Sequence, residues 1–319
     1  MPPVPDSLRG RAFTTAEALA AGVTRRMLEG PRFEAVHRGR GIWAASGEPR
    51  DLAFLLHADR LVLPPDAVVS HVTGLRLHGV DIGGSRRHWS TNAPRRSKLA
   101  SVVLHRRQAP LAATIVGGFP VLPPERCLVD AAIELSHRDI VRAADALIAA
   151  GAMTPESFAR FALTRHLHGV RRSRANAGRT RERVASFRET DLRLLLAVAG
   201  LPEAEVNLDI FDAHGTHLAC GDLVYVQRRI VLEYDGWYHD RTASQRRKDL
   251  IRRENLEADG WLVIVIVSGD LDHPAHLIGR VWRALASRGH TGPPPRFHPW
   301  ELEELARHPK AQRSGSAAR

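Results

Sequence analysis

The clearest pattern of apolar and polar positions lies between residues 186 and 267. It begins with apolar side chains repeated at helical spacing, which predict an amphipathic helix: Leu192, Leu195, Leu196 and Ala199. Alternating runs then predict strands, a polar stretch predicts an exposed helix, and a continuous apolar run predicts a buried strand. The expected elements are a helix over 187–199, strands over 206–211, 221–226 and 230–235, a helix over 243–259 and a strand over 261–267. This order indicates an α/β sandwich.

The second and third of these strands form a hairpin whose register decides which side chains share a face. With 228–229 as a two-residue loop, Val224 lies opposite Glu233 and Asp222 lies opposite Asp235. Side chains alternate between faces along a strand, so the three carboxylates gather on one face. The other face is apolar and is expected to be core: Leu223, Tyr225, Ile230, Leu232 and Tyr234.

The N-terminal residues predict helices over 15–21 and 25–29 and strands over 33–37 and 42–44. Thr14 (or Thr15) and Thr24 can cap the two helices, and Gly22 can end the first. This is the order of a winged helix-turn-helix, in which the second helix enters the major groove and the hairpin contacts phosphates. DNA contacts are therefore expected from four arginines: Arg25, Arg26, Arg38 and Arg40. A protein-contacting or purely structural role for this region is an equally open alternative.

The middle of the chain predicts a mixed region, with helices over 51–63, 70–79, 123–135 and 140–150 and strands over 102–105 and 119–122. Its histidines lack the sequence spacing of a metal site, so structural or surface roles are expected: His71, His78, His88 and His105. The fold class is α/β (α+β). The expected domains are a winged helix-turn-helix over 1–50, a mixed α/β domain over 51–160, a basic connector over 161–185, an α/β sandwich over 186–290 and a tail over 291–319.

The charge balance narrows the class of partner. Lysine and arginine number 46 against 35 aspartates and glutamates, a net charge of +11, and only three of the basic residues are lysines. Ten arginines against three acidic residues between 160 and 193 supply most of this excess. Arginine binds phosphate bidentately, which favours a nucleic-acid partner, with Arg171 and Arg172 among the contacts. Arginine-rich codon usage and a solvated linker helix are the alternatives.

Cysteine content and hydropathy indicate in which cellular compartment the protein is expected. Cys127 and Cys220 stand alone, without a CxxC motif or a Cys/His cluster at zinc spacing, which argues against a disulfide framework or a zinc finger. The first residues lack the apolar core of a signal peptide, and the longest apolar run, 261–267, is far shorter than a membrane span. A cytoplasmic location without membrane association is expected.

Three carboxylates on one hairpin face repel one another unless a cation or arginines neutralise them. Oxygen ligands suit Mg²⁺ or Mn²⁺, so Asp222 and Glu233 are expected to bind the ion and Asp235 to support it. A metal ion held in this way can activate water for phosphodiester hydrolysis. The alternative is an acidic turn that is paired with nearby arginines.

Other side chains could complete such a site. His239 follows the hairpin and could act as general base, while Lys248 and Arg252 share one face of the polar helix and could meet phosphate. Glu189 and Arg193 lie four residues apart on the preceding helix. There Glu189 could orient a metal-bound water or Arg193, and Arg193 could contact nucleic acid.

Seven positions of this segment, Asp249 on the polar helix included, resemble the motif of a known endonuclease family: Glu189, Asp222, Glu233, Asp235, His239, Asp249 and Arg252. The segment 186–267 is similar to the very-short-patch-repair (Vsr)-like endonuclease domain of the PD-(D/E)xK nuclease superfamily. The resemblance implies a restriction-endonuclease-like fold and Mg²⁺-dependent DNA cleavage. The lysine that usually follows the glutamate by two residues is Asp235 here. Its role would pass to His239 or Lys248, or be absent.

The N-terminal half is similar to the winged-helix region of abortive-infection (AbiEi-like) type IV antitoxins, which implies DNA-binding or regulatory activity. The expected function is a metal-dependent DNA endonuclease with a DNA-binding N-terminal domain. The alternative is a non-catalytic DNA-binding regulator, antitoxin-like, with a degenerate nuclease fold. A third possibility is a protein that only contacts a cognate toxin or another protein.

Overall fold

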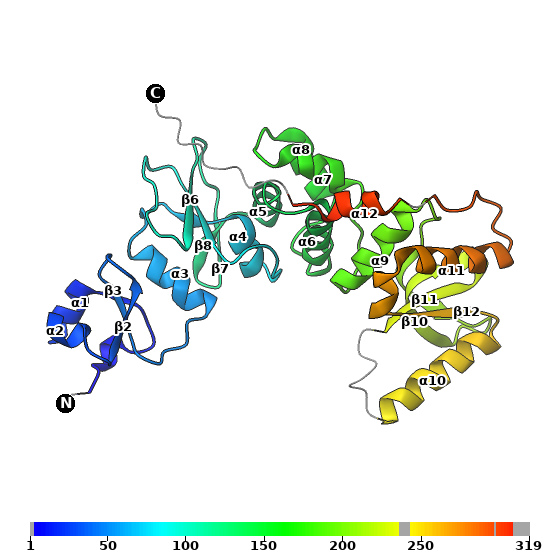
Figure 1. Cartoon of the computed structure of the whole chain (residues 1–319), viewed down its shortest axis with the longest axis horizontal. Coiled ribbons are helices and arrows are strands. Elements are labelled where there is room, and N and C mark those ends of the chain that lie inside the picture. Colours follow the sequence, from blue (N-terminus) through cyan, green and yellow to red (C-terminus); the bar gives the residue numbers. More distant parts are fainter. Residues whose placement is uncertain (1–2, 236–242, 297, 309–319) are drawn as a thin grey trace. The chain divides into compact units, whose positions relative to one another are not determined.

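The computed structural model of the chain describes residues 3–235, 243–296 and 298–308 (Figure 1). The chain divides into two compact units, Met1–Cys127 and Leu128–Arg319. Helices and strands are mixed in both units, which confirms the predicted α/β class. The middle domain expected over 51–160 contributes to both units, because helix α5 (Pro124–Ala131) continues through the point of division.

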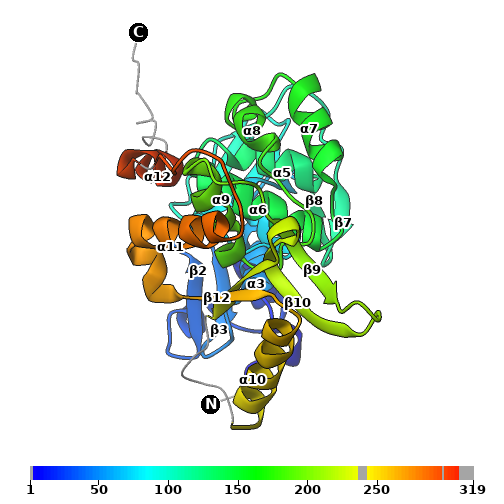
Figure 2. The same ribbon diagram turned by 90° about the vertical axis from the view of Figure 1, so that its right-hand side faces the viewer.

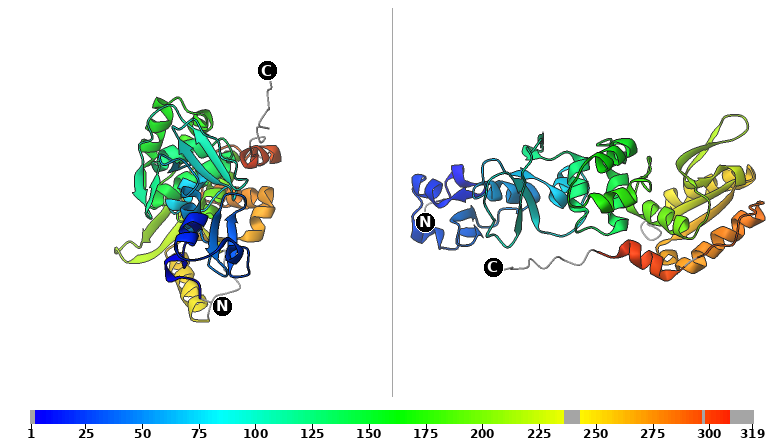
Figure 3. Two further views of the ribbon diagram at one scale, coloured as in Figure 1. Left: turned by 90° about the vertical axis from the view of Figure 1, so that its left-hand side faces the viewer. Right: turned by 90° about the horizontal axis from the view of Figure 1, so that it is seen from above.

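The N-terminal unit begins with a small sheet and two short helices (Figure 3, left, blue). Its elements are η1 (Asp6–Leu8), β1 (Phe13–Thr14), α1 (Thr15–Ala20), α2 (Arg25–Leu28), β2 (Phe33–His37) and β3 (Ile42–Ala45). Thr14 and Glu17 form a capping box at the start of α1, and Thr24 Oγ1 accepts the N–H of Met27 to cap α2. Both predicted helices and the predicted hairpin are confirmed, and β1 adds a third strand beside β3.

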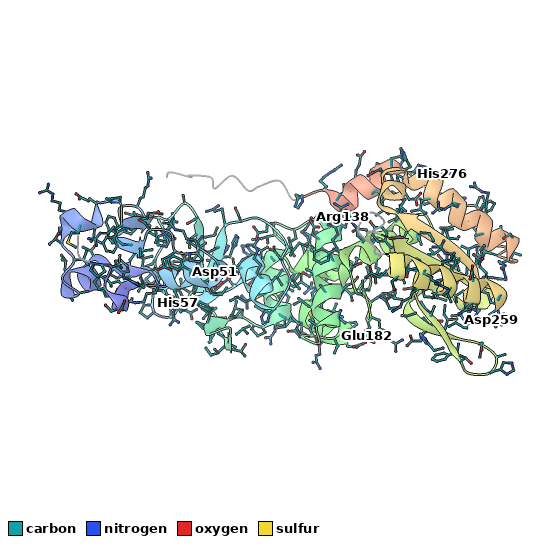
Figure 4. All side chains as sticks on the ribbon, turned by 90° about the horizontal axis from the view of Figure 1, so that it is seen from below. Asp51, His57, Arg138, Glu182, Asp259 and His276 are labelled. Carbon is teal, nitrogen blue, oxygen red and sulfur yellow. The ribbon has the colours of Figure 1, made fainter. Side chains whose placement is uncertain are left out.

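A five-stranded sheet in the order β6-β5-β4-β8-β7 forms the rest of the N-terminal unit. The elements are α3 (Leu52–Arg60), β4 (Val68–Val69), α4 (His71–Leu77), β5 (Arg87–Thr91), β6 (Val102–Arg106), β7 (Thr114–Val116) and β8 (Phe119–Val121). Asp51, labelled in Figure 4, precedes α3 and caps it by accepting the N–H of Phe54 at 2.8 Å. The alternation of apolar and polar residues does not predict β5, because all five of its residues are buried although four of them are polar or charged.

A buried network of side chains joins α3, β2 and β5. The fully buried carboxylate of Asp59 accepts hydrogen bonds from Arg87 Nε at 2.6 Å and Trp89 Nε1 at 3.1 Å, and His37 Nε2 lies 3.0 Å away. Burial by itself would raise the pKa of Asp59, but the hydrogen bonds from His37 and Arg87 and the charge of Arg87 lower it below its ordinary value. Asp59 is therefore a buried anion that depends on these partners.

Helices dominate the start of the C-terminal unit. After α5 they are α6 (His137–Ala149), α7 (Pro155–Thr164) and α8 (Val170–Ala177). The predicted basic connector, 161–185, contains α8, which packs against α7 and has buried residues of its own. Arg172 is half-buried and donates to the carbonyl of Leu135 at 2.9 Å, whereas Arg171 is exposed. Three of the seven arginines of this segment therefore lie on a packed helix, α8: Arg171, Arg172 and Arg174.

A four-stranded sheet in the order β12-β11-β10-β9 forms the second part of the C-terminal unit. Its strands are β9 (Glu205–Phe211), β10 (His217–Tyr225), β11 (Ile230–Asp235) and β12 (Leu262–Val267), and its helices are α9 (Phe187–Val198), α10 (Ala243–Ala258) and α11 (Pro274–Ser287). β11 and β12 are parallel and the other pairs are antiparallel. Helices α9 and α11 cover one face of the sheet and α10 covers the other (Figures 1 and 2). The predicted order of helix, three strands, helix and strand is confirmed.

The hairpin register differs from the predicted one by two residues. Val224 pairs with Val231 and Tyr225 pairs with Ile230, because the loop contains the 3₁₀ turn η2 (Val226–Arg228) followed by Arg229 at a φ of 49°. A shift of two residues leaves every side chain on its predicted face. The apolar face accordingly lies in the main core of the unit: Leu223, Tyr225, Ile230 and Leu232, with Tyr234 partly buried beside them.

The predicted tail, 291–319, contains a helix. After the turn η3 (Ser268–Asp272) and α11, the chain forms α12 (Pro299–Ala306), which packs against α6 and α9 (Figure 2). Leu302 of α12 is partly buried against the main core. Burial of this apolar side chain stabilises the docking of the helix. No helix within the described ranges combines the length and apolarity that are needed to cross a membrane.

Candidate functional site

The two predicted metal ligands lie on neighbouring strands of the C-terminal sheet, Asp222 on β10 and Glu233 on β11. Asp222 Oδ2 accepts the N–H of Tyr234 at 2.6 Å. Glu233 Oε1 lies 2.8 Å from Arg252 Nη2 on α10, and the Glu233 side chain is only 12% exposed. The structure therefore brings Asp222, Glu233 and Arg252 into one cluster, which is called the carboxylate cluster below.

The ionised form of Asp222 is electrostatically unfavourable in the carboxylate cluster. Burial raises the pKa of Asp222 to about 6, and the charges of Glu189 and Glu233 act in the same direction. The hydrogen bond from the N–H of Tyr234 and the charge of Arg252 oppose this rise without cancelling it. Among the described residues, the groups that favour the anionic form of Asp222 are thus outweighed by burial and by the two neighbouring carboxylates.

Glu189 approaches the carboxylate cluster from the first turn of α9 and is held firmly there. One carboxylate oxygen accepts a hydrogen bond from Ser186 Oγ at 2.9 Å. The other accepts from the N–H of Ala185 at 2.9 Å and from Asn207 Nδ2 at 2.6 Å. Its negative charge contributes to the raised pKa of Asp222. Glu189 therefore adds negative charge to the cluster while its own hydrogen-bonding capacity is largely used.

Asn207 is a residue of this region that the sequence pattern does not reveal. It lies in β9 with a φ of 45°, in the left-handed region that asparagine tolerates better than most residues. The pairs on either side of it, Val206 with Leu223 and Leu208 with Gly221, place it across from Asp222. An asparagine inside a predicted strand is the available signal, because strands are depleted in this residue.

The remaining predicted site residues have different outcomes. Asp235 ends β11 beside Val267 and is partly buried. Lys248 is exposed on α10, one helical turn before Arg252, and His239 lies outside the described residues. Arg193 is buried, and its Nη2 is 2.7 Å from the buried carboxylate of Asp145 on α6. This ion pair joins α9 to α6.

The four arginines of the predicted winged helix-turn-helix that are expected to contact DNA are exposed, Arg25 and Arg26 on α2 and Arg38 and Arg40 in the β2–β3 turn. Arg40 also lines a groove of about 320 Å³ together with the loop between β5 and β6. That loop contributes three exposed cations, Arg95, Arg96 and Lys98. We call this the basic groove. Its cations come from separate loops, so no single stretch of sequence indicates it.

A second candidate metal site lies in the N-terminal unit. Among the described residues, one group of three or more metal-binding side chains has its ligand atoms within 4.8 Å of one another: His71, His88 and His105. Burial lowers the pKa of His71 well below its ordinary value and that of His88 to about 4, so both rings are neutral at neutral pH. Sequence spacing does not predict this group, because its members belong to three different elements.

Comparison with known proteins gives no independent assignment. No protein-family model matches the chain, and a search of curated proteins finds no match to it. Function is therefore inferred from the residues and their geometry, and the carboxylate cluster and the basic groove are the two features that bear on it.

Proposed function

We propose that the chain is a metal-dependent DNA endonuclease whose reaction centre is the carboxylate cluster. The observation that carries the proposal is the pairing of Asp222 and Glu233 on neighbouring strands with Asp222 poorly neutralised. The element order α9, β9, β10, β11, α10 and β12 also agrees with the restriction-endonuclease-like fold that the sequence resemblance implies.

The residues fit a Mg²⁺ or Mn²⁺ ion. Mg²⁺ in proteins is commonly held by one or two carboxylates, with water and substrate phosphate oxygens completing its shell. Asp222 and Glu233 can supply the two carboxylates, and the raised pKa of Asp222 marks a position where added positive charge is favourable. The chemistry that such an ion supplies when bound is activation of water and neutralisation of phosphate charge.

The other residues of the site would bind phosphate, hold the carboxylates in place and activate the attacking water. Arg252 holds Glu233 in the free protein and is half-exposed, so it can also turn to a phosphate oxygen. Asn207 donates a hydrogen bond to Glu189 and so holds its carboxylate in place. The negative charge of Glu189 then favours a cation at Asp222. Asp235 stands where the superfamily has its lysine, which leaves Lys248 and His239 as the groups to position or deprotonate the attacking water.

The proposal is tested by cleavage of supercoiled plasmid and single-stranded DNA with Mg²⁺, Mn²⁺ or EDTA. We expect nicking that EDTA abolishes. Glu233→Gln should slow it by about 10²–10³-fold, because an amide is a weak ligand for a hard cation. Glu205→Gln, an exposed position on the same sheet, is the matched control and should cleave like the wild type. Cleavage that persists in EDTA or in Glu233→Gln would refute the proposal.

A second candidate function is DNA binding without cleavage, as in a regulator of the antitoxin type. The basic groove favours it, as does the N-terminal unit's balance of 18 arginines and lysines against ten acidic residues. The ion pair between Glu233 and Arg252 is also what a degenerate nuclease site would retain. Salt-sensitive DNA binding with no cleavage under any metal condition would select this function.

The basic groove makes a prediction that both functions share. Changing Arg95, Arg96 and Lys98 together to alanine should weaken DNA binding and reduce the slope of log affinity against log salt by about 2–3, because each phosphate contact contributes about 0.9. Fluorescence anisotropy at several salt concentrations measures both quantities. Arg9→Ala, an exposed arginine outside the groove, should leave the slope unchanged. An unchanged slope in the triple variant would exclude the groove as a DNA contact.

A further inference from the structure

Three imidazoles meet under helix α4 in the N-terminal unit. His88 lies on β5 and His105 on β6, and the pairing of Ser90 with His105 places His88 and His105 on the same face of the sheet. His71 is the first residue of α4, and its ring stacks on that of His105 with 3.7 Å between centroids. His88 Nδ1 lies 3.1 Å from His105 Nε2. His71 and His88 are buried and His105 is half-buried.

We propose that His71, His88 and His105 form a binding site for a divalent transition-metal ion, with Zn²⁺ as the best-matched probe. Imidazole nitrogen is a preferred ligand of Zn²⁺, and three protein ligands leave one coordination position open. With Zn–N bonds of about 2.0–2.1 Å, two ligand nitrogens of a tetrahedral site stand about 3.3 Å apart. The separation of 3.1 Å between His88 and His105 is already close to that value.

The hydrogen bonds of His71 determine its tautomer and leave the lone pair on Nε2, the nitrogen that would bind the metal ion. Arg107 Nη2 lies 3.2 Å from His71 Nε2, and a guanidinium can only donate, so this nitrogen carries the lone pair. The proton is therefore on Nδ1, which lies 2.9 Å from Ser70 Oγ and donates to it. Ser70 Oγ in turn accepts the hydroxyl of Ser90 at 2.9 Å. A metal-binding histidine that donates its other N–H to a fixed oxygen is the usual arrangement at metal sites.

Binding requires three local changes. The guanidinium of Arg107, which is half-buried, leaves His71 Nε2 and turns toward solvent. One of the two stacked rings, His71 or His105, rotates so that both lone pairs point at the ion. The proton shared between His88 Nδ1 and His105 Nε2 moves to the other nitrogen of its ring, so three neutral imidazoles coordinate the ion without net proton release. Arg107 then stays nearby and favours an anion as the fourth ligand.

The test is calorimetric titration of Zn²⁺ into the full chain after removal of metals with a chelator. We expect one Zn²⁺ per chain at this site. His88→Gln and His105→Gln should each weaken its binding by about 100-fold or more, since even residues outside the coordination shell change affinity 10–100-fold. Arg107→Gln should tighten binding by about fivefold, because it removes a competing cation. His78→Gln is the matched control, since His78 Nε2 contacts the carbonyl of Leu122 and is outside the group.

Two further measurements keep the proposal open to refutation if a histidine variant fails to fold. Circular dichroism reports folding, and Co²⁺ substitution should give the visible absorption of a tetrahedral site in the wild type. Equal Zn²⁺ affinity in wild type and in a folded His105→Gln protein would overturn the proposal. So would the absence of both the tetrahedral Co²⁺ spectrum and the tighter binding in Arg107→Gln.

Discussion

Asp222→Asn should abolish metal-dependent cleavage and at the same time stabilise the C-terminal unit. Loss of a charged metal ligand removes several kcal/mol of transition-state stabilisation, so cleavage should fall by about 10³-fold. The amide can still accept the N–H of Tyr234, which keeps the local backbone hydrogen bond. Plasmid nicking in Mg²⁺ measures the first effect and unfolding in EDTA measures the second.

The stabilisation follows from the pKa of Asp222, which folding raises from an ordinary value of 3.8 to about 6. The folded protein binds this proton more tightly than the unfolded chain, so ionisation of Asp222 lowers the free energy of unfolding as pH rises. Replacing the carboxylate with an amide should therefore add about 1–3 kcal/mol at pH 7.5. The gain should be absent below about pH 4, grow between pH 4 and 6 and stay constant above.

Asp209→Asn is the matched control for both readouts, because Asp209 is exposed on the adjacent strand and pairs with His217 at 3.0 Å. It should change neither cleavage nor stability appreciably. Mg²⁺ should raise the unfolding temperature of the wild type and not that of Asp222→Asn. An inactive and destabilised Asp222→Asn protein would indicate a structural role, and an active one would remove Asp222 from the site.

Asp59→Ala should be among the most destabilising single changes in the N-terminal unit. The substitution leaves Arg87 buried without its bidentate partner and removes the acceptor of the Trp89 indole. Breaking a buried ion pair from one side costs about 3–5 kcal/mol. Because the pKa of Asp59 is lowered by folding, its contribution is present at neutral pH and is lost as acid protonates it.

Urea unfolding with hydrogen exchange of peptides from α3 and β5 would localise this loss. Asp81→Asn provides the contrast, because Asp81 pairs with Arg76 on the surface with its side chain 88% exposed, and such pairs contribute about 0–1 kcal/mol. Similar losses in the two variants would contradict the buried-network interpretation of Asp59.

The sequence predicts the parts of this fold that follow a simple period. Alternation along β10 and β11 assigns their faces correctly, and caps such as Thr14 and Thr24 locate helix starts because they satisfy backbone donors locally. The predicted hairpin register is wrong by two residues, because the loop is longer than predicted and includes Arg229 in a left-handed conformation. Arginine is not a residue type that predicts this conformation. Strand β5 is not predicted because its polar residues are buried through long-range partners such as Asp59.

Site residues that depend on tertiary contacts are the hardest to predict. The cluster of Asp222, Glu233 and Arg252 follows from strand faces and one helix, so the sequence suffices to suggest it. Arg193 looks available on a helical face and is instead buried against Asp145, a residue 48 positions away. The basic groove and the three histidines combine residues from separate elements, and only the folded chain brings them together.

The loop between β10 and β11 has a consequence for how this protein can change in evolution. Because side chains alternate faces, insertion or deletion of two residues within 226–229 would keep the two carboxylates and the apolar core on their own faces. A change of a single residue that shifted the pairing would turn one of the strands over, unless a bulge or a different turn absorbed it. Homologous sequences should therefore vary in this loop mostly by even numbers of residues, and odd changes should coincide with loss of the acidic pair.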